Sequence, residues 1–198
     1  STTEETDLSS LLPISQIFST YILAQSNDKL FIIDQHAAHE RIIYEKYRKE
    51  YENEEVIIQN LLTPEVISLT NFEIDLIMNN LKLLERLGFL VERFDTNSII
   101  IRGVPILFGE PQIKNLFLEL IDALDSNIKG NYELRLDKII KLACTNAIKG
   151  GDRIGKIEIV SLLEQLARTQ NPYTCPHGRP IIIEISKEYI EKEFKRIM

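Results

Sequence analysis

The pattern of apolar and polar positions predicts that strands and helices are mixed along the chain. Two apolar runs, 17–24 and 30–33, flank the turn-forming sequence Ser-Asn-Asp at 26–28, and this arrangement predicts a β-hairpin. Helix-favouring residues follow directly, and Asp34 is suited to cap a helix that reaches about Tyr51. The chain is therefore expected to begin with a ββα arrangement.

The middle of the chain starts with two short strands and a helix. Residues 56–58 and 65–69 are typical of strands on either side of the segment 59–64. A capping box at 70–73 opens a helix that is expected to end at Gly88. The apolar stripe of this helix, which its spacing predicts to face the core, consists of Phe72, Leu76, Leu83, Leu84 and Leu87.

The second half is predicted to be mostly helical until a proline-rich loop. The elements expected there are a hairpin of 89–94 with 98–104 and helices over 111–124, 134–148 and 157–168, the first of them with Pro111 in its first turn. The segment 171–180 contains three prolines, which exclude a helix. It leads into an apolar strand at 181–185, and Ser186 is suited to cap the last helix.

This order of elements predicts an α+β fold with two lobes. The ββα start and the ααβα end are expected to form one lobe from residues 11–52 and 146–198. The middle, 53–145, would then be inserted as a second lobe. Residues 1–10 begin without Met and are mostly polar, so we interpret them as the remnant of a linker in a longer protein.

Composition and charge narrow the class of protein. No run among the 198 residues approaches the ~20 apolar residues of a membrane span, and the first residues lack the order of a signal peptide. Two cysteines are too few for a disulfide framework, so we expect thiols in a reducing, cytoplasmic compartment. A formal charge of −7 argues against avid, unaided binding to DNA, because phosphate contacts require a basic surface.

The boundary between the strand 30–33 and the following helix gathers groups that bind metals. Asp34 and His36 are two residues apart, so on an extended segment they point the same way. His36 and Glu40 are one turn apart on the same face of the helix. The stretch therefore suits a metal site. It equally suits a capping aspartate, a buried histidine and a surface glutamate that happen to be close.

The second half of the chain offers softer ligands. Cys175 and His177 are two apart in the proline-stiffened loop, and Cys144 lies on a predicted helix. Zinc accepts such mixed sulfur, nitrogen and oxygen ligands, whereas Mn²⁺ or Mg²⁺ prefers the oxygens. An inert core thiol at Cys144 and loop residues without a ligand role remain the alternatives. His39 and Glu45 are excluded as ligands because they lie away from Glu40 around the helix. Zinc-dependent base deamination is excluded because its P-C-x-x-C signature is absent.

Three motifs resemble those of the C-terminal domain of MutL, the DNA mismatch-repair protein, of the bacterial type that carries endonuclease activity. Asp34-Gln35-His36-Ala37, Glu40 and Glu45 match its D-Q-H-A-x2-E-x4-E motif. The sequence C-P-H-G-R-P at 175–180 is matched without a change. Its A-C-R motif is matched at 143–145 except that Thr145 replaces the basic residue, so a charge contribution there is in doubt.

The resemblance implies an Mn²⁺-dependent endonuclease that nicks duplex DNA, with zinc as a regulatory or structural ion. It implies a homodimer through the lobe built from both chain ends, a regulatory middle lobe, and an N-terminal ATPase domain in the same protein. The ligands that it implies are Asp34, His36, Glu40, Cys144, Cys175 and His177. Asp34, His36 and Glu40 are expected to carry catalysis, with Glu40 bridging two ions that activate water and neutralise phosphate charge.

The segment 59–64 gains a second interpretation from the resemblance. By itself Q-x-x-L-x-P is a short pattern, and a strand with a turn explains it. In the family it resembles the peptide that docks on the DNA sliding clamp. Gln59 would then donate and accept hydrogen bonds through its amide, while Leu62 and Pro64 fill an apolar groove.

Other functions and contacts remain open from the sequence. Arg153, Lys156 and Arg179 are candidates for contacts to DNA phosphates, although ordinary surface charge explains each of them equally well. A non-catalytic dimerisation and clamp-docking module with a structural zinc is the alternative function. A metallohydrolase that acts on small molecules is a third hypothesis, and it predicts a deep pocket.

Overall fold

The computed structural model describes residues 7–108, 112–125, 132–147 and 153–196. It is a mixed α+β structure with two antiparallel sheets, which confirms the predicted fold class. The chain divides into two compact units, one of Ser1–Glu45 with Lys149–Met198 and one of Lys46–Ile148. These boundaries lie three to seven residues from the predicted ones. None of the described helices has the length and apolar character needed to cross a membrane.

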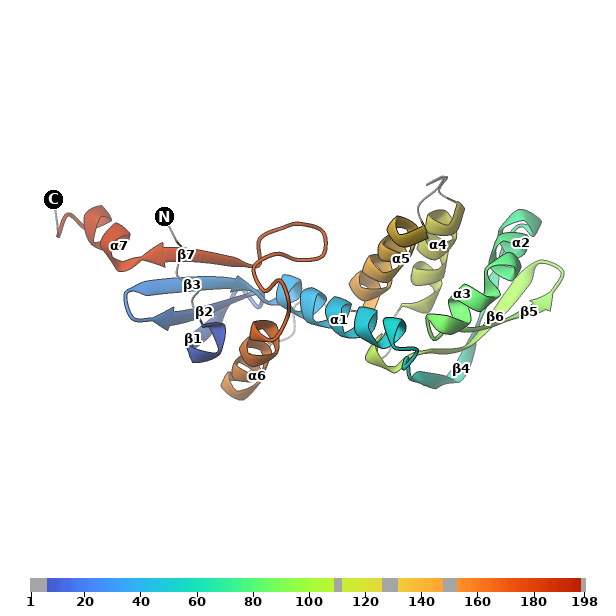
Figure 1. Cartoon of the computed structure of the whole chain (residues 1–198), viewed down its shortest axis with the longest axis horizontal. Helices are drawn as coiled ribbons and strands as arrows, with labels where there is room; N and C mark the ends of the chain where they lie inside the picture. The colour runs from blue at the N-terminus through green and yellow to red at the C-terminus, as the bar shows by residue number, and fades with distance from the viewer. Residues whose placement is uncertain (1–6, 109–111, 126–131, 148–152, 197–198) are drawn as a thin grey trace. The chain divides into compact units, whose positions relative to one another are not determined.

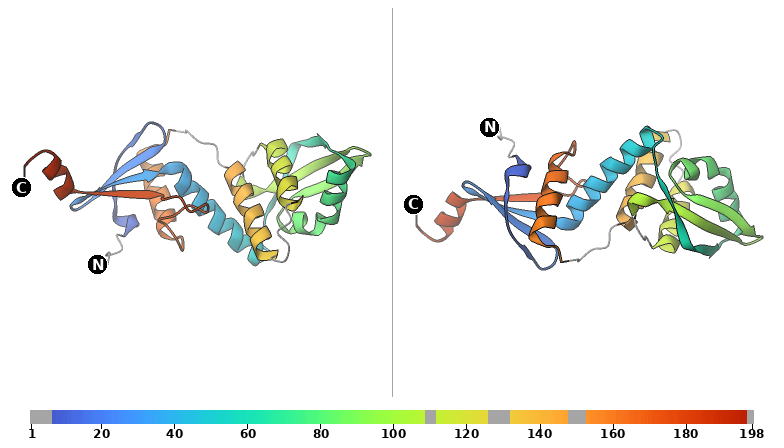
Figure 2. Two further views of the ribbon diagram at one scale, coloured as in Figure 1. Left: turned by 90° about the horizontal axis from the view of Figure 1, so that it is seen from above. Right: turned by 90° about the horizontal axis from the view of Figure 1, so that it is seen from below.

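The first unit is built on a four-stranded antiparallel sheet of order β1-β2-β3-β7 (Figure 1). Its elements are a 3-10 turn η1 (Leu8–Ser10), β1 (Leu12–Ile17), β2 (Tyr21–Ser26), β3 (Lys29–Asp34), the start of α1 (Gln35–Glu52), α6 (Lys156–Ala167), β7 (Ile182–Ser186) and α7 (Lys187–Glu193). The helix α6 lies against one face of this sheet, as both views in Figure 2 show.

Alternation along the central strands creates the core of this unit. Ile22 of β2 and both Phe31 and Ile33 of β3 are fully buried and face α6, where Leu162 and Leu166 meet them. The residues between them point to the other face of the sheet. One sequence expectation is corrected at the start of the unit: the predicted linker ends earlier, because Leu8 packs into this core.

The apolar run 17–24 is not a single strand, because it contains the turn of a hairpin that β1 and β2 form. β1 ends at Ile17, and Phe18 and Ser19 both have a φ of 52°, so the chain reverses direction before β2. The backbone N–H of Thr20 donates to the carbonyl of Ile17 at 3.1 Å and closes the turn. Sequence analysis missed this turn because positive φ usually falls on glycine or asparagine rather than on phenylalanine.

Within the described residues, the second unit contains a three-stranded antiparallel sheet of order β4-β6-β5 together with helices and a 3-10 turn. Its elements are β4 (Ile58–Ser68), α2 (Asn71–Asn79), α3 (Leu81–Arg86), β5 (Leu90–Asp95), β6 (Ser98–Pro105), η2 (Ile106–Phe108), α4 (Ile113–Asp125), α5 (Tyr132–Ala147) and the end of α1. Its core includes Tyr47, which is fully buried and whose hydroxyl donates to the carbonyl of Leu87.

Two further expectations are corrected in this unit. The two short strands predicted around 59–64 are one strand, β4, whose pairing with β6 is interrupted between Asn60 and Glu65. The helix predicted from 70 to 88 breaks at Asn80, whose side chain donates to the carbonyl of Leu76 at 2.7 Å. Phe72, predicted in the core stripe, is 62% exposed because the buried face of α2 is that of Ile74 and Ile77, from which Phe72 points away around the helix.

Local signals for helix starts and hairpins are confirmed. The Thr70 hydroxyl and the Glu73 carboxylate form the predicted capping box of α2, and Ser186 caps α7. The hairpins β2–β3 and β5–β6 pair as expected. Gly88, the predicted end of the helix before β5, has a φ of +83°, which favours glycine. The predicted helix start at Pro111 lies outside the described residues.

Candidate metal centre

Asp34 joins β3 to α1, as the sequence predicts. Its backbone N–H donates to the carbonyl of Ile181 at 2.9 Å, and its Oδ1 accepts the backbone N–H of Ala37 at 3.0 Å. The carboxylate therefore caps α1 and directs its first turn. The following residue, Gln35, is buried, and its Oε1 accepts a hydrogen bond from Gln16 of β1 at 2.6 Å.

The loop before β7 is folded on itself. The backbone N–H of Cys175 donates to the carbonyl of Arg179 at 2.8 Å, and Gly178 donates back to Cys175 at 2.9 Å. This tight turn requires a φ of +85° at Gly178, which is why glycine suits the position. Thr174 and Pro180 pair as an isolated antiparallel bridge at its base. Cys175 and His177 are thus presented on a stiff turn.

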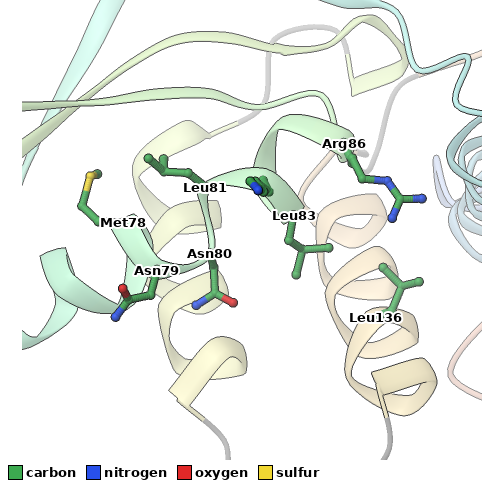
Figure 3. Close-up of a pocket in the computed structure, with 8 residues that line it drawn as sticks. Met78, Asn79, Asn80, Leu81, Leu83, Arg86 and Leu136 are labelled. Carbon is green, nitrogen blue, oxygen red and sulfur yellow. The ribbon is translucent and has the colours of Figure 1, made fainter.

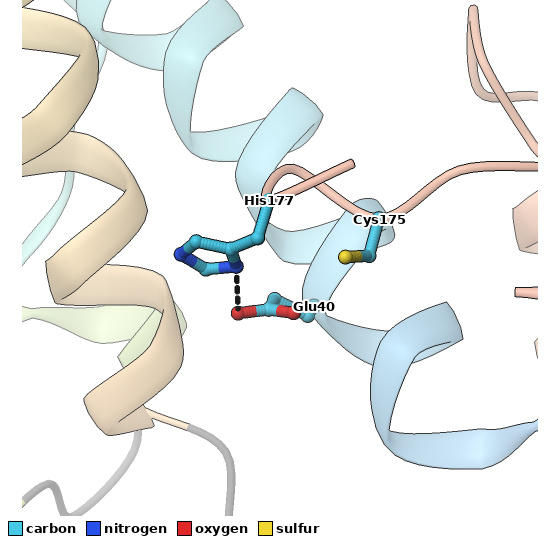
Figure 4. A group of neighbouring side chains, drawn as sticks. All are labelled: Glu40, Cys175 and His177. Atoms are coloured by element: carbon cyan, nitrogen blue, oxygen red, sulfur yellow. Dashed lines mark ion pairs between the residues drawn. The ribbon is translucent and has the colours of Figure 1, made fainter. Parts of the chain in front are cut away.

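Three of the predicted ligands come together between α1 and this loop. One ligand atom from each of Glu40, Cys175 and His177 lies within 4.8 Å of the other two (Figure 4). The His177 Nδ1 is 3.0 Å from Glu40 Oε1. Glu40 and Cys175 are both 1% exposed, whereas the His177 side chain is 39% exposed. A buried carboxylate and a buried thiol beside a partly exposed imidazole form a donor set that suits zinc.

The other predicted ligands are not part of this group of three among the described residues. Asp34 and His36 belong to the same compact unit and precede Glu40 on the β3–α1 junction. Cys144 belongs to the second unit, where it is buried on α5. Ligation by Asp34, His36 and Cys144 stays a prediction.

Arg179 lies beside Glu40 and Cys175. The hydrogen bond that Arg179 donates to Cys175, together with the electrostatic interaction with that residue, raises the pKa of the Arg179 guanidinium above its ordinary value, and Glu40 and Asp34 raise it to a smaller extent. Its Nη2 is 3.9 Å from Glu40 Oε2, and the side chain is 67% exposed.

Comparison with known proteins places these motifs in a family. The family model described as the MutL C terminal dimerisation domain matches residues 14–154. The chain belongs to the MutL family. The DNA mismatch repair protein MutL of Thermoanaerobacter pseudethanolicus is 42% identical over 192 residues, covering 96% of this chain and 31% of that protein. The MutL of Clostridium tetani is 42% identical over 196 residues, covering 96% and 32%. The chain thus spans about a third of the length of these relatives.

Two residues of α1 contact the loop that carries Cys175 and His177. The sequence analysis assigned no role to either of them. Arg41 Nε donates to the carbonyl of Thr174 at 2.7 Å. Glu45, the last residue of the MutL-type motif, accepts the backbone N–H groups of Gln170 and Asn171 at 2.6 and 3.2 Å. Within α1 these two side chains also form an i,i+4 ion pair, with Arg41 Nη1 3.4 Å from Glu45 Oε1. Their contact with a loop distant in sequence required the structure.

The segment expected to dock on a sliding clamp lies in β4, in the second unit of this MutL-family chain. Gln59 pairs with Val104 of β6, while Leu62 lies where the pairing with β6 is interrupted. The Leu62 side chain is fully exposed, and Pro64 is half-buried. Because β4 is an edge strand, the segment is extended and accessible on one side.

The three basic residues proposed to contact DNA are all exposed in the first unit. Arg153 precedes α6, Lys156 is the first residue of α6, and Arg179 lies beside Glu40.

Burial lowers the pKa of the His39 imidazole, and the neighbouring His36 lowers it further. A neutral His39 therefore adds no positive charge near the site at neutral pH.

A pocket of ≈ 920 Å³ lies in the second unit. Figure 3 shows its lining at the junction of α2 and α3 and at α5, including Met78, Asn80, Arg86 and Leu136. None of the residues that line it is a predicted metal ligand, so it does not supply the pocket expected of a small-molecule metallohydrolase.

Proposed function

We propose that this domain is a metal-dependent endonuclease domain that nicks duplex DNA in mismatch repair and is recruited and activated by the sliding clamp. The observation that carries the proposal is the convergence of Glu40, Cys175 and His177 at the point where Asp34 and His36 enter α1. Membership of the MutL family agrees with a role in mismatch repair. The relatives are about three times longer, and an N-terminal ATPase domain of the same protein is proposed as a further partner.

Glu40, Cys175 and His177 would hold zinc, and Cys144 and His36 are proposed to complete that set. Asp34, His36 and Glu40 would hold Mn²⁺. When bound, a divalent ion at such a site lowers the pKa of water and neutralises charge on phosphate. The buried Glu40 carboxylate holds the imidazole of His177 in place through Nδ1. The exposed guanidinium of Arg179 is available to orient a phosphate, together with Arg153 and Lys156.

The proposal is tested by metal analysis of the purified protein together with nicking of supercoiled plasmid in Mn²⁺. We expect bound zinc and slow, Mn²⁺-dependent conversion to the open circular form. Activity should fall steeply with salt, because the acidic chain binds DNA weakly by itself. A chelator should abolish the nicking activity, and added Mn²⁺ should restore it.

The alternative function is a dimerisation and clamp-docking module with a structural zinc. The burial of Cys175 within the hydrophobic core cluster of the first unit favours this alternative, because a structural zinc site ties segments of a core together. Plasmid nicking by a sample tethered to the sliding clamp distinguishes the two functions. A module without catalysis would bind zinc and the clamp but produce no open circles.

We expect the domain to form a homodimer through the first unit. Leu23, Ile32 and Ile183 are cross-strand neighbours on the sheet face opposite to the one that α6 covers, and Ile183 is 57% exposed. Ile183→Lys should weaken dimerisation by at least ~10-fold, because it places a charge in the centre of this apolar face. Sedimentation velocity at micromolar concentration measures the change. A parent protein that sediments only as a monomer would contradict the prediction.

Clamp stimulation is expected to depend on the segment in β4. Replacing both Gln59 and Pro64 with alanine should remove the stimulation by the clamp and leave the slow unassisted nicking unchanged, since tethering only raises local concentration. The measurement compares nicking rates with and without a loaded clamp, at equal metal content. The double substitution Val66→Ala with Ser68→Ala, further along the same strand, is the control. If the clamp stimulates the Gln59/Pro64 variant as strongly as the parent, the segment does not dock on the clamp and is only part of the strand.

A further inference from the structure

The loop that carries Cys175 and His177 is held on α1 by a carboxylate. Glu45 Oε2 accepts the backbone N–H of Gln170 at 2.6 Å, and Oε1 accepts that of Asn171 at 3.2 Å. These two residues follow the end of α6 and begin the loop. Hydrogen bonds from backbone amides to an ionised carboxylate are stronger than those between neutral groups, so the start of the loop is fixed to one point of the helix.

Arg41 fixes the same loop one residue before Cys175. Its Nε donates to the carbonyl of Thr174 at 2.7 Å, and its Nη1 lies 3.4 Å from Glu45 Oε1. The Arg41 and Glu45 side chains are only 11% and 18% exposed. Burial weakens competition from water, so this pair is expected to hold its geometry better than an exposed ion pair does.

Apart from the contacts of His177 and Arg179 with Glu40, the rest of the loop is supported mainly by its own hydrogen bonds. Cys175 is bonded to Gly178 and Arg179 within the turn, and Tyr173 accepts the N–H of Ile181. The turn can therefore keep its internal shape and still shift as a body relative to α1. Because Glu40 belongs to α1, such a shift would separate the thiol and the imidazole from the carboxylate.

We propose that Glu45 and Arg41 are positioning residues of the metal centre. They set the distance of Cys175 and His177 from Glu40 by fixing the two points where the loop approaches α1, and neither contacts the ion. The inference rests on the proposed metal site. It gives Glu45, the final glutamate of the D-Q-H-A-x2-E-x4-E sequence, a role other than metal ligation.

The first measurement is amide hydrogen exchange in the metal-free protein. Glu45→Ala should speed exchange at Gln170 and Asn171 by ~10-fold or more, because both amides lose a charged acceptor. Glu45→Gln retains one acceptor oxygen and should show a smaller increase, which also guards against misfolding of the alanine variant. The matched control is Glu52→Ala, which removes an exposed arginine–glutamate pair of the same spacing, with Arg48, from the same helix. It should leave both amides unchanged.

The second measurement is titration with Co²⁺, followed by the absorption of the cobalt–thiolate bond. Glu45→Ala should weaken cobalt binding by ~10–100-fold, as loss of outer contacts to metal ligands does, whereas Glu52→Ala should bind like the parent. Unchanged exchange and unchanged cobalt affinity in Glu45→Ala would overturn the positioning role alone. If the parent binds no cobalt although its Gln170 and Asn171 amides exchange slowly, the proposed metal site itself is wrong.

Discussion

Glu40→Gln is expected to remove bound zinc and to abolish Mn²⁺-dependent nicking. The carboxylate is 1% exposed, it is 3.0 Å from His177 Nδ1, and its other oxygen faces the guanidinium of Arg179 at 3.9 Å. A neutral amide of the same shape cannot neutralise a divalent ion, and one of its two polar atoms is a donor. Since loss of an outer contact already costs ~10–100-fold in metal affinity, loss of this ligand should cost at least ~100-fold.

Zinc analysis and a plasmid nicking assay on the same preparation measure both effects. Glu184→Gln is the matched control, because Glu184 is a partly exposed glutamate of the same unit that forms an ion pair with the exposed Lys29. It should keep zinc and activity at the parent level. The double variant Cys175→Ser with His177→Ala should lose zinc to a similar extent. Zinc retained by Glu40→Gln at the parent level would contradict the ligand assignment.

Asp34→Asn is expected to abolish nicking while the fold, the dimer and the bound zinc are retained. Asp34 caps α1 through Oδ1, and asparagine caps helices about as well, so stability should change by less than ~1 kcal/mol. Asp34 is outside the group formed by Glu40, Cys175 and His177, so zinc should remain. The loss of one carboxylate from the Mn²⁺ site should lower the nicking rate by at least ~100-fold.

Thermal unfolding, sedimentation, zinc content and nicking rate together test this separation of roles. Asp28→Asn, in the exposed turn between β2 and β3, is the matched control for the loss of one negative charge. Full nicking by Asp34→Asn would remove Asp34 from the catalytic assignment. Loss of zinc together with activity would show instead that Asp34 belongs to the zinc set.

Glu40→Gln and Asp34→Asn therefore probe different parts of one junction. The first variant should lose both the bound zinc and the reaction, and the second should lose the reaction alone. A module whose zinc is only structural predicts that the parent nicks no DNA and that Glu40→Gln is destabilised by loss of the ion. The comparison of zinc content with nicking thus also distinguishes the two proposed functions.

Local features of the fold followed from the sequence alone. The apolar run 30–33 followed by Asp34 and helix-favouring residues predicted a strand that runs into a capped helix, as β3 and α1 show. Both depend on hydrogen bonds and side-chain directions within a few residues. The same holds for the capping boxes and for the hairpins with asparagine or aspartate in their turns.

Local preference failed where tertiary contacts override it. The turn at Phe18 and Ser19 uses a backbone conformation that neither residue favours, and it is maintained because β1 pairs with β2 on the sheet. The segment 59–64 has the composition of a turn but remains extended as part of the edge strand β4. In both places the pairing of a whole strand outweighs the preference of two or three residues.

By itself the sequence determined which residues are chemically able to bind a metal, and the D-Q-H-A and C-P-H-G-R-P motifs indicated the family that the comparisons then established. Only the tertiary structure decided that Glu40 meets Cys175 and His177, and that Arg41 and Glu45 hold their loop against α1. The physical reason is that spacing along a helix or strand fixes neighbours within one element. Contacts between α1 and a loop far along the chain depend on how the sheet places β3 beside β7.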